Sequence, residues 1–368
     1  YTATGTTLTR TVSESSNADA AIVLTGSATV FIGATAADIP ALYAESYDGT
    51  SGLPVATGST NAVAIGRAYA DGTDSFAAAI ANNTSSYGAT GDESVAMGRF
   101  AKATGSRSIA LGGNATATAL FATALTNSYA SGGDSFAAGM DSASASYGAQ
   151  ATSSIAIGKQ AKATGAYGTA IGEATQATAS NSVCMGYYSQ ATAQGAVAIG
   201  YDAQATAGKS YSFGLKVRNA IQNTFRFAGG HFSAAGDAQS GIYIMRSDTT
   251  DATAEALTTT KTAASTDNQV ILPNNSAYFF SGTIIARQQA SAGTDVGAWE
   301  IKGAIRREAN AASTVLVKST IDDFNVPTGW AVALTANTTN GGLAITVTGA
   351  AATNIRWVAT VNTSEVTY

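Results

Sequence analysis

The tetrapeptide Ile155-Ala-Ile-Gly158 returns at a fixed interval along the middle of this 368-residue chain, for example as Val183-Cys-Met-Gly186 and Val197-Ala-Ile-Gly200. The interval between these neighbouring copies is fourteen residues or a multiple of it. The glycines that carry the repeat are Gly98, Gly112, Gly158, Gly172, Gly186, Gly200 and Gly214. A fixed period of this length is typical of a chain that coils into identical turns.

Each repeat contains two short alternating segments, which predict two strands per coil. Before the glycine, large apolar residues flank a small one, as Ile155 and Ile157 flank Ala156. We expect the glycine to occupy the bend between the strands, because it tolerates backbone angles that a Cβ forbids. We expect the bulky residues of one strand and the small residues of the other to point inward. The intervening alanines would then face outward: Ala96, Ala110, Ala156 and Ala198.

The repeat predicts a body of roughly eleven coils, which at about 4.8 Å per stacked strand would be about 50 Å long. A slower repeat overlies it, since Asp74-Ser-Phe76 returns sixty residues later as Asp134-Ser-Phe136. Both observations indicate that the coiled part of the chain grew by duplication.

The coil motif with its trailing Ala-x-Ala-Thr, over about residues 63–214, resembles the head repeat of trimeric autotransporter adhesins. The resemblance implies a left-handed parallel β-roll that assembles as a homotrimer. A physical argument agrees, because two strands of four or five residues enclose too little apolar surface for a comfortable monomer. The small alanines expected on the outside would suit close contact with a neighbouring chain. The neck, stalk and membrane anchor of that family are not recognisable here, so we expect the roll to be a shared module.

The last third of the chain shows successive alternating runs separated by turns, among them Pro273-Asn-Asn275 and Asn340-Gly-Gly342. Such spacing predicts an antiparallel β-sandwich, jelly-roll-like in form. The segments 234–239, 269–276 and 355–359 resemble a C-terminal module of bacteriophage tail fibres. That resemblance implies a trimeric fibre whose distal knob touches the host.

The predicted fold is therefore all-β, a trimeric left-handed β-roll shaft followed by an antiparallel knob. We divide the chain into an N-terminal β cap or adaptor (1–60), the roll (61–214), a neck or linker (215–235) and the knob (236–368). Within the cap, strands are predicted at 8–12 and 20–32, with a turn at 39–43.

The composition excludes several classes of protein. A single cysteine, Cys184, excludes an intrachain disulfide framework and reads as a small buried residue. The net charge of −5 gives no pull toward nucleic acid. No apolar run reaches the length of a membrane span. Because the chain begins with Tyr1 and shows no leader, we expect a fragment, a processed chain or the ordered end of something longer.

The sequence offers little for catalysis, and we expect no enzymatic activity and no cofactor. Glycan cleavage needs two carboxylates held in one groove. In the roll, the only acids that recur in register are Asp74 and Asp134, and their position after a glycine-containing turn favours a structural role in that turn. In the knob, Asp322 and Asp323 are adjacent and would point to opposite faces of a strand. No metal is expected within one chain; the alternative is a metal held by His231 and its two copies on a threefold axis.

Candidate receptor contacts are aromatic and basic. Tyrosines at coil corners can stack on sugars or simply shield the coil edge, and arginines of the knob can contact anionic sugars. The predicted receptor-binding residues are Tyr187, Tyr188, Tyr201, Arg287, Arg306 and Arg356. The sequence thus predicts a virion tail fibre that recognises a host glycan or outer-membrane component and joins other tail or baseplate proteins through its N-terminal side. The alternatives are a bacterial trimeric adhesin head and a polysaccharide depolymerase with an inter-chain site.

Overall fold

The structure, a computed structural model, describes residues 2–4, 7–9, 55–56, 60–80, 86–139, 144–290 and 293–368. The chain divides into two units, Tyr1–Asp48 and Gly49–Tyr368. In the first unit β1 (Thr2–Thr4) pairs antiparallel with β2 (Thr7–Thr9). The strand predicted at 20–32 and the turn at 39–43 lie outside the described residues, and the role of this segment as a cap stays a prediction.

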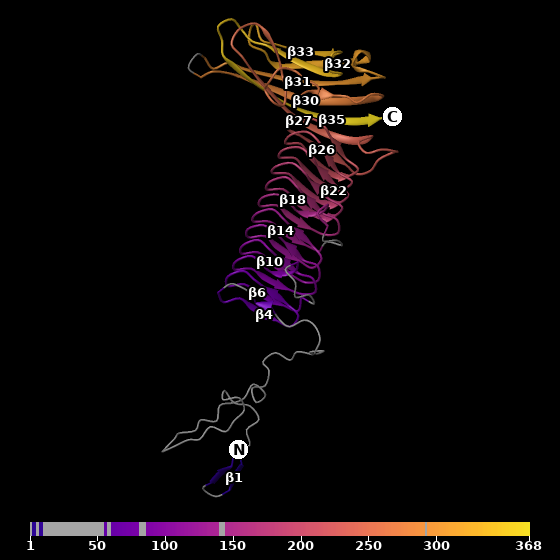
Figure 1. Cartoon of the computed structure of the whole chain (residues 1–368). Coiled ribbons are helices and arrows are strands. Elements are labelled where there is room, and N and C mark those ends of the chain that lie inside the picture. Colours follow the sequence, from indigo (N-terminus) through magenta and orange to yellow (C-terminus); the bar gives the residue numbers. More distant parts are fainter. Residues whose placement is uncertain are drawn as a thin grey trace. The chain divides into compact units, whose positions relative to one another are not determined.

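The second unit begins with a β-solenoid of about fourteen residues per coil, as the sequence predicted. One strand from each coil joins a parallel ladder, in which Val183 of one coil lies against Val197 of the next. Figure 1 shows these strands stacked in order from β4 to β26. The ladder contains β4 (Val63–Ile65), β6 (Phe76–Ala78), β8 (Val95–Met97), β10 (Ile109–Leu111), β12 (Thr123–Leu125), β14 (Phe136–Ala138), β16 (Ile155–Ile157), β18 (Thr169–Glu173), β20 (Val183–Tyr187), β22 (Val197–Tyr201), β24 (Tyr211–Leu215) and β26 (Thr224–Ala228).

The second strand of each coil forms a parallel ladder of its own. Its strands are two residues long, and the second residue of each is nearly always alanine. They are β3 (Val55–Ala56), β5 (Tyr69–Ala70), β7 (Gly88–Ala89), β9 (Lys102–Ala103), β11 (Thr116–Ala117), β13 (Tyr129–Ala130), β15 (Gly148–Ala149), β17 (Lys162–Ala163), β19 (Gln176–Ala177), β21 (Gln190–Ala191), β23 (Gln204–Ala205) and β25 (Arg218–Asn219). The register follows the fourteen-residue period where that period is regular, as between Val183 and Val197, and it is kept where the spacing stretches, as between Phe136 and Ile155.

The core of the solenoid is built from alanine, which corrects the expected orientation of the first strand. Ala96, Ala110, Ala156 and Ala198 are fully buried, whereas Ile155 and its equivalents point outward. Alternation specifies two faces but not which of them is inside. Because alanines also line the opposite ladder, as at Ala163, the two ladders face each other across a space that fits small side chains on both sides. Cys184 stands in the same buried row.

Every coil is turned by residues with positive φ, which lie in the left-handed region. At one corner Tyr167, Asn181 and Lys209 have φ between 53° and 59°, and the N–H of each donates to a carbonyl of the preceding coil. At the bend after the first strand, the seven repeat glycines have φ between 99° and 145°. A Cβ on Gly186 would lie 2.0 Å from the Gly200 carbonyl oxygen, so the stacked coils leave no room for a side chain there.

The parallel ladder continues beyond residue 214 and then changes direction. Tyr211 pairs with Phe225, so β25 and β26 are rungs of the solenoid within the segment 215–235 that the sequence suggested as a neck. The buried Asn219 closes this last coil by donating to the Thr224 carbonyl (2.9 Å) and accepting from the Thr224 hydroxyl (3.0 Å). β27 (Ala238–Thr249) then pairs antiparallel with β26, and the C-terminal sheets grow from this edge.

The C-terminal part consists of two antiparallel sheets. The larger extends the solenoid ladder in the order β26, β27, β35 (Ile355–Thr367), β30 (Ser276–Gln288), β31 (Val296–Arg307) and β32 (Val315–Asn325). The smaller contains β28 (Ala254–Ala256), β34 (Gly342–Thr348), β29 (Val270–Ile271) and β33 (Ala331–Asn337). A single 3-10 turn, η1 (Ala311–Ser313), precedes β32, and the described residues contain no α-helix.

Residues of both C-terminal sheets share one apolar core. Leu343, Ile345 and Val347 of β34 belong to the same buried cluster as Tyr243 of β27. All three tryptophans are buried there, as expected from their place in alternating runs: Trp299 stacks on Trp357 with ring centroids 5.4 Å apart, and Trp330 packs against Trp357. None of the described segments forms a helix long and apolar enough to cross a bilayer.

Candidate functional site

The outward side of the first ladder, which we call the outer face, carries a row of large apolar side chains. Met97 is 43% exposed and Ile199 is 36% exposed, although their sequence pattern is that of a core strand. The other exposed members include Val63, Ile109, Ile155, Met185 and Phe227. This face is the consequence of putting alanine inside, because the alternate residues of each strand must then point to solvent.

The side of the sheet that carries the outer face continues onto the C-terminal sheet, where polar residues such as Ser240 and Thr360 stand among the apolar ones. Phe225 of β26 is the register partner of Ile242 in β27, and paired residues of an antiparallel ladder lie on the same side. Farther along the same sheet, Val358 of β35 pairs with Ile285 of β30, and both are exposed. The solenoid and the C-terminal sheet therefore present one surface.

Three of the predicted contact residues form an aromatic cluster at the ends of β20 and β22, after the glycine bend. The ring of Tyr187 lies 4.4 Å from that of Tyr188 and stacks on Tyr201 at 4.9 Å, measured between centroids. Tyr188 and Tyr201 are about half exposed. Local burial, then the neighbouring Tyr188 and Glu173, raise the pKa of Tyr187 above its usual value. The cluster offers adjoining ring surfaces of the kind on which sugars stack.

Two of the predicted arginines come together at one end of the C-terminal sheet. Arg287 of β30 and Arg356 of β35 are register partners, and Asp248 of β27 lies next in the same row. The Asp248 carboxylate pairs with Lys261. The three residues line a cavity of about 600 Å³.

Amide groups complete the wall of this cavity. Asn354 Nδ2 donates to Gln289 Oε1 (2.8 Å), and the Gln289 N–H donates to the Asn354 carbonyl (2.9 Å). Two adjacent guanidinium groups beside amides suit an anionic, hydroxyl-rich ligand, because guanidinium pairs with carboxylate in a fork-to-fork geometry. We call this arrangement the arginine row.

Arg306 does not join the arginine row. It pairs in register with Ala277, near the opposite ends of β30 and β31, and its guanidinium bonds with Glu308. In the tyrosine cluster, Tyr187 and Tyr201 end the solenoid strands β20 and β22, and Tyr188 stands at the corner directly after β20. The predicted contact residues thus form two groups and one isolated member on the same continuous sheet.

The acidic residues considered for catalysis take structural positions. Asp74 and Asp134 both have φ of 55° and stand at coil corners, where the N–H of Asp134 donates to the Leu120 carbonyl (2.9 Å). Asp322 pairs with Lys302 at 3.5 Å on the exposed side of β32. His231 is exposed, and no group of three or more potential metal ligands occurs within the part of the chain that the structure describes. A histidine site on a threefold axis stays a prediction.

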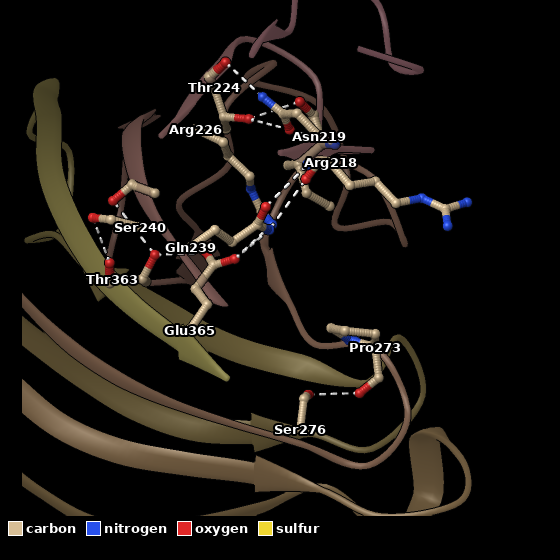
Figure 2. Close-up of polar contacts among 12 residues, drawn as sticks. Arg218, Asn219, Thr224, Arg226, Gln239, Ser240, Pro273, Ser276, Thr363 and Glu365 are labelled. Carbon is tan, nitrogen blue, oxygen red and sulfur yellow. Dashed lines mark hydrogen bonds and ion pairs between the residues drawn. The ribbon is translucent and has the colours of Figure 1, made fainter. Parts of the chain in front are cut away.

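A buried charged cluster at the end of the solenoid was not anticipated. Arg226 Nη1 lies 2.7 Å from Glu365 Oε2, and both residues are about 95% buried. Figure 2 shows Glu365 also accepting from Gln239, at 2.9 Å. Arg226 further bonds with the Tyr243 hydroxyl. The sequence held one signal for this cluster, an arginine between two phenylalanines at 225–227, where alternation assigns it to the side opposite the rings.

Comparisons with known proteins agree with the repeat. Residues 89–125 and 149–210 match the YadA head domain repeat, in overlapping segments at 89–115, 103–125, 149–173, 163–189, 177–203 and 191–210. No curated protein matches the chain. The chain therefore carries adhesin-type head repeats, folded as a β-solenoid, over part of its length.

Among solved structures, one match is the tailspike protein gp49 from Acinetobacter baumannii bacteriophage Fri1, a capsular polysaccharide depolymerase. The match has 8% identity and a TM-score of 0.22, and covers 77% of this chain but only about half (51%) of the other. Because a depolymerase stands among the matches, our expectation of a chain without enzymatic activity is corrected and withdrawn. A likeness this distant carries no argument about chemistry, and we assign no reaction from it.

Proposed function

We propose that this chain is an extracellular attachment protein, a segment of a phage tail fibre that forms a homotrimer and binds a host cell-surface glycan or other outer-membrane component. The observation that carries the proposal is the outer face, where side chains typical of a protein core are left in water. Contiguous apolar surface of this kind marks an interaction site in a soluble protein. The adhesin-type repeats support the same interpretation.

The partner that fits the outer face best is a second copy of the chain. The apolar side chains recur once per coil, at the spacing of stacked parallel strands, and an identical chain repeats them at the same spacing. Copies placed side by side can therefore bury the rows along their whole length, with a gain of roughly 25 cal/mol for each Å² of apolar surface removed from water. The alanine core supplies little such burial within one chain.

Self-association would also place the tyrosine cluster and the arginine row beside the grooves between neighbouring copies. The tyrosine cluster and the arginine row lie on the same continuous sheet as the apolar rows, so grooves between the copies would receive the receptor. Three weak contacts on one fibre raise the overall affinity without any single tight site. The N-terminal side would connect the fibre to other tail or baseplate proteins.

The oligomer is tested by measuring the native mass. For the unmodified chain we expect three times 36.7 kDa by light scattering. Ile199→Lys places a charge on the outer face and should yield monomers, whereas Gln190→Lys, on the opposite ladder, is the matched control and should leave the mass unchanged. A folded monomer of the unmodified chain at micromolar concentration would contradict the proposal.

Attachment is tested by adding fluorescently labelled protein to a panel of bacterial strains. The variant that carries both Arg287→Gln and Arg356→Gln should keep its oligomeric mass and lose surface binding on strains that bind the unmodified chain. Incubation of the purified surface polysaccharide, followed by a reducing-end assay, decides whether a bound polymer is also cleaved. Unchanged attachment of the double variant would remove the arginine row from the proposal.

A further inference from the structure

A second cavity lies where the solenoid meets the C-terminal sheets, on the side away from the outer face. Its volume is about 570 Å³, within the usual range for a small-molecule site. Arg226, which alternates with the outward Phe225 and Phe227, reaches it from β26. Arg307 reaches it from β31, in one row with Ser276 and Thr367. A neighbouring copy on the outer face would leave this cavity open.

The walls carry more positive than negative charge. Arg218, Arg226 and Arg307 line the cavity, with Asp237 as the lining acid. The Asp237 carboxylate already accepts the N–H groups of Phe232 (2.9 Å), Ser233 (2.6 Å) and Ala234 (2.6 Å). Glu365, just behind the wall, is paired with Arg226. Among the described residues, neither Arg218 nor Arg307 has a carboxylate within ion-pair distance.

The guanidinium groups also retain unused donors. Arg307 Nη1 donates to the Leu272 carbonyl (2.6 Å), which fixes the side chain against the wall. Its Nε, the Nε of Arg226 and the Thr367 hydroxyl are buried without a hydrogen-bond partner among the described residues. The Arg218 side chain extends away from the Glu365 cluster, as Figure 2 shows. Buried donors without partners are costly, and a ligand removes this cost only where a small shift of the wall exposes them. The exposed guanidinium of Arg218 is open to a ligand without such a shift.

The remaining wall is apolar. Pro273 is exposed and Ile271 keeps 9% of its surface, so these two residues form the apolar surface of the cavity, with the buried Ile221, Leu272 and Tyr278 behind them. A ligand that fits both sides has a carboxylate at one end and a compact carbon framework at the other. A free inorganic anion would leave the apolar wall unused.

We propose that this junction cavity binds a single carboxylated sugar unit, with the carboxylate held by Arg307 and Arg218 and the apolar face of the sugar ring packed against Pro273 and Ile271. The inference rests on the proposed attachment function and names a second place of contact, outside the grooves between copies. An acidic polysaccharide could then be held at two different kinds of site on one chain.

The experiment uses the full chain and two probes, D-galacturonic acid and N-acetylneuraminic acid, each compared with its methyl ester in NMR titrations. At least one free acid should bind more tightly than its ester. Arg307→Gln should weaken this binding about tenfold or more, the scale of a lost charge-assisted hydrogen bond. Because Arg307 also holds the Leu272 carbonyl, Arg218→Gln is the second variant. The Arg218 guanidinium makes no hydrogen bond or ion pair with any described residue, so its loss should leave folding intact. Lys318→Gln, on β32 and outside the cavity, is the matched control.

Binding of neither free acid, equal binding of acid and ester, or unchanged binding in both arginine variants would overturn the inference. The attachment assay separates this outcome from failure of the proposed function. If bacterial strains still bind the chain while both acids fail, the junction cavity is excluded and attachment through the outer surface stands. If attachment fails while an acid binds in the arginine-dependent manner, the cavity is a sugar site in a protein with another role.

Discussion

At the scale of single residues, the stacked coils depend on glycine at the bend. Gly186 has φ of 114°, and a Cβ there would lie 2.0 Å from the Gly200 carbonyl oxygen. Gly186→Ala should therefore lower the free energy of unfolding by about 3 kcal/mol, at the upper end of the cost of backbone strain. Gly230→Ala, with nothing within 4 Å of the added Cβ, is the control and should change little. Equal Tm values for the two variants in thermal unfolding would contradict this account.

The carboxyl of Asp237 makes a second residue-scale prediction, about pH. Burial opposes ionisation, but hydrogen bonds from the N–H groups of Ala234, Ser233 and Phe232 outweigh it and lower the pKa to about 2 from a usual value near 3.8. A carboxyl with a lowered pKa stabilises the fold above its unfolded pKa, and this contribution is lost as pH falls from about 4 to about 2. Denaturant unfolding at pH 5 and pH 2.5 should show a smaller difference for Asp237→Asn than for the unmodified chain.

At the scale of elements, the sequence predicted the coil, its two strands, the glycine bend and the antiparallel C-terminal strands, because each follows from a local period. It gave the wrong inward side of the first strand, since Ile155-Ala-Ile157 alternates equally well in either phase. The deciding information was the width of the space between the ladders, a tertiary property. The arginine row illustrates the same limit: Arg287 and Arg356 are 69 positions apart in the chain, and only strand pairing brings them together.

The alanine core predicts a high cost for added volume. Ala198 is fully buried between ladders that both carry alanine, so Ala198→Val should reduce stability by about 1–3 kcal/mol through overpacking. The control is Ile199→Val, next to it on the exposed side of β22, which removes one methylene group and adds no volume to the core. Chemical denaturation at low protein concentration should rank Ala198→Val as clearly less stable. The reverse order would indicate that the first strand points its bulky residues inward.

A buried ion pair joins Arg226 of β26 to Glu365 of β35 across the intervening β27, and its loss should be costly. Burial disfavours the charged guanidinium of Arg226, yet Glu365 and Tyr243 outweigh it and keep the pKa of this arginine above its usual value. Glu365→Gln leaves the charge of Arg226 buried without its counter-ion, so the free energy of unfolding should fall by about 3–5 kcal/mol. Adding Arg226→Met to this variant should restore part of the loss, which a double-mutant cycle measures. A loss that persists in full would show that the hydrogen bonds of the cluster, rather than its charges, stabilise the junction.

At the scale of the whole molecule, a thin alanine core beneath an exposed apolar face predicts that folding and assembly are coupled. Binding that involves only the folded state stabilises it by mass action, so the Tm of an oligomer rises with protein concentration. We expect the Tm of the unmodified chain to increase over a hundredfold range of concentration, and Ile199→Lys to have a lower, concentration-independent Tm. Differential scanning calorimetry at several concentrations provides the measurement. A Tm that is high and the same at every concentration would mean that the single chain is stable alone, and the outer face would then have to be explained by a partner other than a second copy.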